Sequence, residues 1–151
     1  MKRILRRDRP TILRVTPPAI PPHTSARQLQ EAVGMVRFAL ELCEIQEKGG
    51  RAYVLELPVK DRAWNLPTLA TFVLKEEVMI KDVTPRYRAV TNSVTISDTM
   101  QRMRSRGGVA SADETRLSSV NDCPDWLCDA MLKAVGIWSS PVSKLCVGWI
   151  L

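Results

Sequence analysis

The sequence has few of the residues from which metal and redox sites are built. It contains one histidine and four cysteines among 151 residues. No two cysteines have the C-x-x-C spacing that is typical of a zinc site or a thiol–disulfide motif. We therefore expect no metal site. Cys43 and Cys128 fall on apolar faces of predicted helices, so they are expected to be small core residues.

Long apolar segments are missing as well. No apolar run approaches the roughly 20 residues that cross a bilayer. The N-terminal segment lacks the apolar stretch of a secretory signal. We therefore expect an intracellular protein, cytoplasmic or nuclear, with reduced thiols and no membrane partner.

Aromatic residues are scarce, at 5% of the chain, so the core must be built mainly from aliphatic side chains. Apolar residues make up 45% and charged residues 25% of the chain, which is ordinary for a soluble globular protein. A length of 151 residues favours one domain with a single core.

Positive charge is concentrated near the N-terminus. The chain has a net charge of +6, and its first ten residues hold five cations against one acid, Asp8. The five cations are Lys2, Arg3, Arg6, Arg7 and Arg9. We predict that residues 1–10 form a basic, flexible arm that contacts DNA or RNA, with a solvated, disordered end as the alternative. Arg102, Arg104 and Arg106 form a second basic cluster that could contact phosphates or lie in a solvated loop.

The first half of the chain alternates between strand and helix signals. Residues 11–16 are rich in β-branched side chains and predict a strand. Residues 17–23 contain four prolines and predict a stiff, extended loop. Ser25 and Gln28 have the spacing of a capping box, which opens an amphipathic helix over residues 26–48. Gly49 and Gly50 end that helix.

From residue 52 on, the chain again contains strand and helix signals. Ala52 to Leu55 predict a buried strand that runs on to Glu56, Leu57 and Pro58. The remaining predictions are a helix capped by Asn65, strands at 78–83 and 87–91, a helix from Ser97 to about Arg104, a flexible loop at 105–121, and a helix from Asp122.

This order of elements favours an α/β fold. Strands joined by helices imply parallel pairing, so we expect a partial Rossmann-like domain with a mostly parallel sheet of about four strands and flanking helices. The domain is expected to span residues 11–138. The loops at Pro17 and at Glu56 should then face one crevice beyond the carboxyl ends of their strands. Residues 139–151 form an apolar tail, which could add a strand or, through Leu145–Leu151, pair with itself or with another chain.

Several segments together resemble a known family. Thr16–Ser25 resembles the Pro-Pro-Cys loop of cytosine-C5 DNA methyltransferases, and Arg51–Pro58 resembles their Glu-Asn-Val strand. A methyltransferase-like module of retrotransposon polyproteins is more similar still. It shares the helix end Leu42–Gln46, a later Trp (here Trp64), the Tyr87–Ser93 segment and the helix start at Asp122.

The resemblance implies a degenerate and truncated module. The family's nucleophilic cysteine aligns with Ala19, which has no nucleophile. Glu56 matches the family's glutamate and is the one candidate catalytic residue, although Leu57 and Pro58 replace the Asn and Val that follow it. The methyl-donor site of such enzymes begins with a glycine-rich loop, and no glycine precedes Gly34. We therefore expect Ala19 to face a relic Glu56, with no cofactor bound.

The sequence thus predicts a non-catalytic remnant of a mobile-element methyltransferase-like domain that associates weakly with nucleic acid. The alternatives are a methyltransferase completed by a partner chain and an interaction module that uses the apolar tail. Each of the other candidate residues also has a simpler structural explanation. Glu56 could pair with Arg51 or Arg62, His23 could be exposed rather than a base, and Trp64 could pack on the core edge rather than stack on a base.

Overall fold

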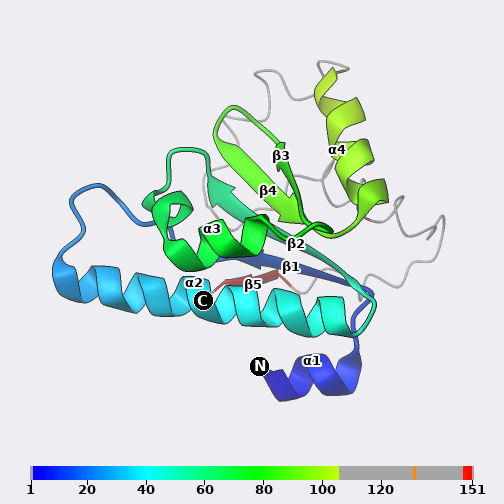
Figure 1. Cartoon of the computed structure of the whole chain (residues 1–151), viewed down its shortest axis with the longest axis horizontal. Helices are drawn as coiled ribbons and strands as arrows, with labels where there is room; N and C mark the ends of the chain where they lie inside the picture. The colour runs from blue at the N-terminus through cyan, green and yellow to red at the C-terminus, as the bar shows by residue number, and fades with distance from the viewer. Residues whose placement is uncertain (1, 106–130, 132–147, 151) are drawn as a thin grey trace.

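The computed structural model describes residues 2–105, 131 and 148–150, and shows a sheet with helices on both faces (Figure 1). In chain order the elements are α1 (Lys2–Asp8), β1 (Ile12–Thr16), α2 (Ala26–Lys48), β2 (Ala52–Pro58), the 3-10 helix η1 (Arg62–Asn65), α3 (Pro67–Val73), β3 (Met79–Asp82), β4 (Tyr87–Thr91), α4 (Val94–Ser105) and β5 (Gly148–Ile150). The predicted α/β class is confirmed.

The sheet is mixed, so the prediction of a mostly parallel sheet is wrong for half of its pairings. The strand order is β3-β4-β2-β1-β5. β1 is parallel to β2 and to β5, whereas β4 is antiparallel to both β2 and β3. The cause is local: β3 and β4 are joined by a short turn rather than by a crossover helix. A tight turn can connect only antiparallel strands.

β2 is the central strand and is buried on both faces, as predicted. Tyr53, Leu55 and Leu57 belong to the larger core cluster, which lies under α2 and α3. Val54 belongs to a second cluster on the opposite face, together with side chains from α4. Because successive side chains of a strand point to opposite faces, Glu56 lies on the same face as Val54.

α2 has the bounds that its local signals predict. The Ser25 hydroxyl accepts a hydrogen bond from the Gln28 amide at 3.4 Å, and the Gln28 side chain accepts one from the Ser25 amide at 3.2 Å. This is the expected capping box. Gly49 and Gly50 follow the last turn, and Gly50 has a φ of +65°, which favours glycine.

The N-terminal segment differs from the flexible arm that its charge predicts. Lys2–Asp8 form helix α1, and Leu5 is only 3% exposed. Leu5 joins the larger core cluster, and Lys2 makes an ion pair with Glu41 of α2. One buried apolar side chain in a charged segment leaves no periodic signal in the sequence, so this helix was not predicted.

Two helix starts also differ from the predictions. Asp61, not Asn65, caps the segment before α3: its carboxylate accepts the Ala63 amide at 2.7 Å, and η1 follows. α4 begins at Val94, with the Ser93 hydroxyl accepting the Ile96 amide at 3.4 Å. Ser97, the predicted cap, is instead buried within that helix.

Part of the apolar tail forms a strand of the protein's own sheet. Gly148–Ile150 form β5, which pairs in parallel with residues 14–16 of β1. Of the alternatives for this tail, the added strand is the one that these three residues adopt. Ser105, the first residue of the predicted loop at 105–121, is instead the last residue of α4, and the rest of that loop lies outside the described residues, as does Cys128. Of the helix predicted from Asp122, Met131 is described, and it is helical and buried. Within the described part of the chain, no helix is long and apolar enough to span a membrane.

Candidate functional site

Glu56 lies within β2 and is held in a buried ion pair. Its side chain accepts two hydrogen bonds from Arg14 of β1, Nε to Oε1 at 2.6 Å and Nη2 to Oε2 at 2.8 Å. Glu56 is 5% exposed and Arg14 is 8% exposed. This bidentate geometry is the strongest form of a carboxylate–guanidinium contact. The sequence analysis missed Arg14 as the partner of Glu56.

The predicted partners of Glu56 are engaged elsewhere. Arg51 donates from Nε to the Gln46 side chain at 2.7 Å. Arg62 donates to the Pro22 carbonyl at 3.1 Å. Because Arg14 contacts both oxygens of Glu56, a role in proton transfer would compete with the buried pair. The arrangement therefore favours a structural role for Glu56.

Ala19 and Glu56 do not face each other, which corrects the expectation that they would, although the loops after β1 and β2 do lie together, joined by Ile20–Asp61 and Arg62–Pro22 hydrogen bonds. Glu56 lies on the sheet face that α4 covers. The loop after β1 turns the other way: Ile20 packs into the core cluster under α2, and Ala19 lines a groove beside α2. β1 and β2 are parallel neighbours, as predicted, yet their two candidate residues project to opposite faces of the sheet.

The groove beside α2 contains the histidine of the chain. It has a volume of about 460 Å³ and is lined by Pro18, Ala19, Pro21, His23, Thr24, Gln28, Glu31, Ala32 and Met35. His23 is exposed, as the alternative to a role as a base predicts. Neither a serine nor a cysteine lines this groove, and the hydroxyl that does, that of Thr24, donates to the Pro21 carbonyl at 2.6 Å.

Asp61 is a buried acid that the sequence analysis assigned no role. Its two carboxylate oxygens accept the Ile20 amide at 3.0 Å and the Ala63 amide at 2.7 Å. It therefore ties the proline loop after β1 to the segment after β2. The sequence signal that could have identified Asp61 is its position, three residues after Pro58, the last residue of β2.

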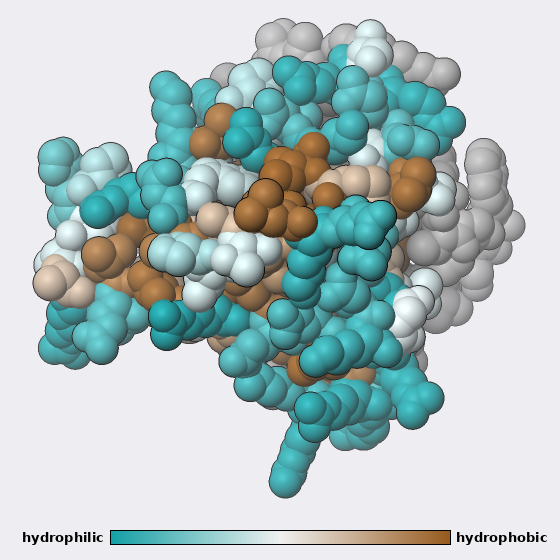
Figure 2. Space-filling view, in the orientation of Figure 1, coloured by the Kyte–Doolittle hydropathy of each residue, from teal (hydrophilic) through white to brown (hydrophobic). Residues whose placement is uncertain are grey.

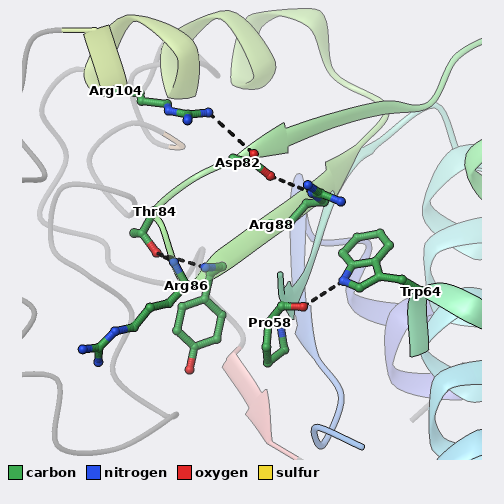
Figure 3. A network of polar contacts seen from close by, with 8 residues as sticks. Pro58, Trp64, Asp82, Thr84, Arg86, Arg88 and Arg104 are labelled. Atoms are coloured by element: carbon green, nitrogen blue, oxygen red, sulfur yellow. Dashed lines mark hydrogen bonds and ion pairs between the residues drawn. The ribbon is translucent and has the colours of Figure 1, made fainter. Parts of the chain in front are cut away.

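Trp64 packs on the core edge rather than offering a free face. Its Nε1 donates to the Pro58 carbonyl at 2.8 Å (Figure 3). The guanidinium of Arg88 lies over the indole, 5.3 Å from the ring centroid. The ring also packs against the larger core cluster. Base stacking on Trp64 would therefore require that Arg88 move away.

Arg88 belongs to a charge network at the edge of the sheet. Asp82 lies between Arg88 and Arg104 in Figure 3, with Nε of Arg88 at 2.6 Å and Nη1 of Arg104 at 3.8 Å from its oxygens. The hydrogen bond from Arg88 lowers the pKa of Asp82, and the charges of Arg88 and Arg104 act in the same direction. Arg104, a predicted phosphate contact, is thus partly neutralised within the protein.

The other members of the second basic cluster are less informative. Arg102 is exposed on α4 and donates to the Thr99 hydroxyl at 3.2 Å. Arg106 lies outside the described residues. α1 and α4 occupy opposite ends of the molecule in Figure 1, so the structure does not join the two basic clusters into one surface.

The cations of α1 form the more open cluster. Lys2 pairs with Glu41, and Arg7 pairs with its neighbour Asp8 at 2.6 Å. Arg3, Arg6 and Arg9 are exposed and make no ion pair with the described residues. The lower part of the surface in Figure 2, around α1, is mostly hydrophilic. Leu5, inserted in the core, fixes the face of α1 that presents these cations.

A second groove, between α2 and α3, is occupied at its rim by an internal charge cluster. The groove has a volume of about 480 Å³, and Lys75 lies on its wall. The Lys75 ammonium contacts Glu44 at 3.3 Å and Glu47 at 3.2 Å, and lies 4.6 Å from the Phe72 ring centroid. Cys43 is buried nearby, and burial raises the pKa of its thiol, so it is not an activated nucleophile.

No cluster of histidine, cysteine or acidic side chains suited to a metal ion occurs among the described residues. Comparison with protein-family models, with curated proteins and with solved structures gave no match for this chain.

Proposed function

We propose that this chain is a non-catalytic α/β domain that associates with nucleic acid through α1. The observation that carries the proposal is a short helix, docked through Leu5, that presents Arg3 and Arg6, followed by Arg9, to solvent without acidic partners among the described residues. Exposed guanidinium groups bind phosphate oxygens and release the counterions condensed on the nucleic acid.

The lack of catalysis is supported by the geometry of the candidate residues. Glu56 is bound at both oxygens by Arg14, and Ala19 lies over the other face of the sheet. Descent from a methyltransferase-like module of a mobile element remains part of the proposal. The parallel adjacency of β1 and β2 supports it, because the two resembling motifs follow or lie on these strands.

The expected binding is weak, independent of base sequence and sensitive to salt. Contacts from about three arginines predict that log affinity falls with log salt at a slope of roughly −2 to −3. Base-specific recognition is not expected, since arginine contacts to phosphates carry no sequence information directly.

Fluorescence anisotropy tests this proposal, with a labelled 20-base-pair DNA duplex and a single-stranded RNA of equal length in a salt series. The variant Arg3→Gln/Arg6→Gln should weaken binding to both and reduce the slope by about 2. The matched control Arg27→Gln/Lys60→Gln removes two exposed cations elsewhere and should keep most of the affinity. An affinity that does not change with salt, or equal losses in both variants, would contradict the proposal.

A further inference from the structure

The loop between β1 and α2 has the composition of a polyproline II helix. Four of the six residues from Pro17 to Pro22 are proline. Proline fixes its own φ near −65°, and the residue before each proline is restricted to extended conformations. No peptide bond among the described residues is cis. Together these restrictions favour a left-handed helix with three residues per turn over residues 17–21, before the turn at Pro22 and His23.

The burial of this loop repeats with the same period of three. Pro17 and Ile20 are buried, and Ile20 is only 2% exposed. Pro18 is half-buried, and Ala19, Pro21 and Pro22 are exposed. A helix with three residues per turn has three edges, so one edge is anchored in the core and the other two face outward.

The loop is fixed in place from both sides. The Ile20 amide donates to Asp61 at 3.0 Å, and Arg62 donates to the Pro22 carbonyl at 3.1 Å. The segment ends in a turn at Pro22 and His23, where the Thr24 amide at 3.3 Å and the Thr24 hydroxyl at 2.6 Å both donate to the Pro21 carbonyl. A partner therefore meets a segment that is already ordered, and preorganisation lowers the entropic cost of binding.

We propose that Pro17–Pro22 is a docking segment for a protein domain that reads polyproline II helices with a groove of aromatic side chains. Domains of the SH3, WW and EVH1 classes bind in this way. The outward dipeptides Pro18–Ala19 and Pro21–Pro22 enter the partner's groove, while Pro17 and Ile20 stay in the core of this chain. Exposed Arg62 beside Pro22 adds a positive charge at one end, which an acidic rim of the partner complements.

This surface is independent of the proposed contact with nucleic acid. The loop lies at the end of the molecule where α2 begins, whereas α1 packs against α2 further along, through Lys2, Glu41 and Phe38 (Figure 1). The outward edges of the loop are uncharged, so phosphate binding does not account for their exposure. The two surfaces can therefore be tested separately in the same chain.

The test titrates the full chain against immobilised, purified domains of the SH3, WW and EVH1 classes. At least one domain should bind with a dissociation constant in the range of roughly 1–100 μM, and Pro21→Ala/Pro22→Ala should weaken this binding at least about tenfold. Pro85→Ala, an exposed proline of the β3–β4 turn, is the matched control and should bind like the unmodified chain.

A second variant separates recognition from loop stability. Ala19→Asp places a charge on an outward edge without touching Pro17, Ile20 or their anchors, and it should abolish binding while circular dichroism and the unfolding midpoint stay unchanged. Arg3→Gln/Arg6→Gln should leave this binding intact. The proposal is overturned if no domain binds the unmodified chain more tightly than it binds Ala19→Asp and Pro21→Ala/Pro22→Ala.

Discussion

At the scale of single residues, the ion pair of Arg14 and Glu56 is the main polar contact at the centre of the sheet. Each carries a full charge in a nearly buried position, between strands whose other side chains are mostly apolar. Removing one partner from a buried ion pair is costly because the remaining charge keeps its desolvation penalty. The pair is thus a constraint on the sequence through its effect on stability.

Glu56→Leu should lower the free energy of unfolding by about 3–5 kcal/mol, since it leaves the Arg14 guanidinium buried without its carboxylate. The double variant Arg14→Met/Glu56→Leu should recover at least half of that loss. Urea denaturation of both single variants and the double variant gives the coupling energy directly. A loss of less than about 1 kcal/mol in Glu56→Leu would show that the pair is unimportant for stability.

The ion pair between Arg14 and Glu56 could have been predicted from the sequence. Arg14 and Glu56 are the charged residues within two apolar strands that were predicted to be parallel neighbours, and they have opposite signs. Two opposite charges in adjacent buried strands predict an ion pair, because neither can be buried alone. Asp61 was harder to place, since one of its two donors, the Ile20 amide, comes from a loop whose approach depends on the tertiary fold, whereas the other, the Ala63 amide, is local.

At the scale of elements, prediction succeeded where the signals are local. The capping box and the two glycines correctly predicted where α2 begins and ends, because each acts within one turn of the helix. β4 has the predicted bounds as well. The direction in which β4 pairs was not predictable in the same way, because parallel pairing was inferred from the neighbouring helices rather than from the short turn that joins β3 to β4.

The β3–β4 hairpin should show a specific dependence on pH. The pKa of Asp82 is lowered in the folded protein, so its contact with Arg88 stabilises the fold above the ordinary aspartate pKa and is lost as the pH falls through the lower folded value. Asp82→Asn should therefore be less stable than the unmodified chain at pH 7, and the difference should shrink below about pH 4.

Urea midpoints at pH 7, 5, 3 and 2 measure this effect. Asp98→Asn, which removes an exposed carboxylate of α4 that makes no ion pair with the described residues, serves as the control and should show little difference at any pH. If Asp82→Asn keeps a constant deficit down to pH 2, its cost does not come from the charge.

At the scale of the whole molecule, β5 covers one edge of the sheet. Its pairing with β1 engages backbone groups that would otherwise form an open edge, and open edges promote association between chains. The described part of the tail is thus used within the chain, which weakens the reading of Leu145–Leu151 as a surface for self-association.

Ending the chain after Val147 should lower the urea midpoint and increase the apparent mass in light scattering, because the edge of β1 becomes exposed. Trp149→Pro, which keeps the chain length but removes a backbone donor, should have a smaller effect in the same direction. A truncated chain that is less associated than the full one would instead identify the tail as the self-association surface.

Charge clusters in the sequence gave no information about their relative positions. The clusters in α1 and α4 both look like phosphate contacts in the sequence, yet they lie at opposite ends of the molecule, and Arg104 is paired with Asp82. The position of each cluster depends on the sheet order, which places β1 and β3 on different sides of β2.

The pairing of β5 with β1 also sets an order for biosynthesis. β1 to β4 lie within residues 12–91, whereas the register that joins Arg14 to Gly148 spans most of the chain. On the ribosome, the four-stranded part of the sheet can therefore assemble while the residues of β5 are still untranslated. During that interval the outer edge of β1 is open to other nascent chains, and the newly made protein is most dependent on chaperones until translation supplies the last strand.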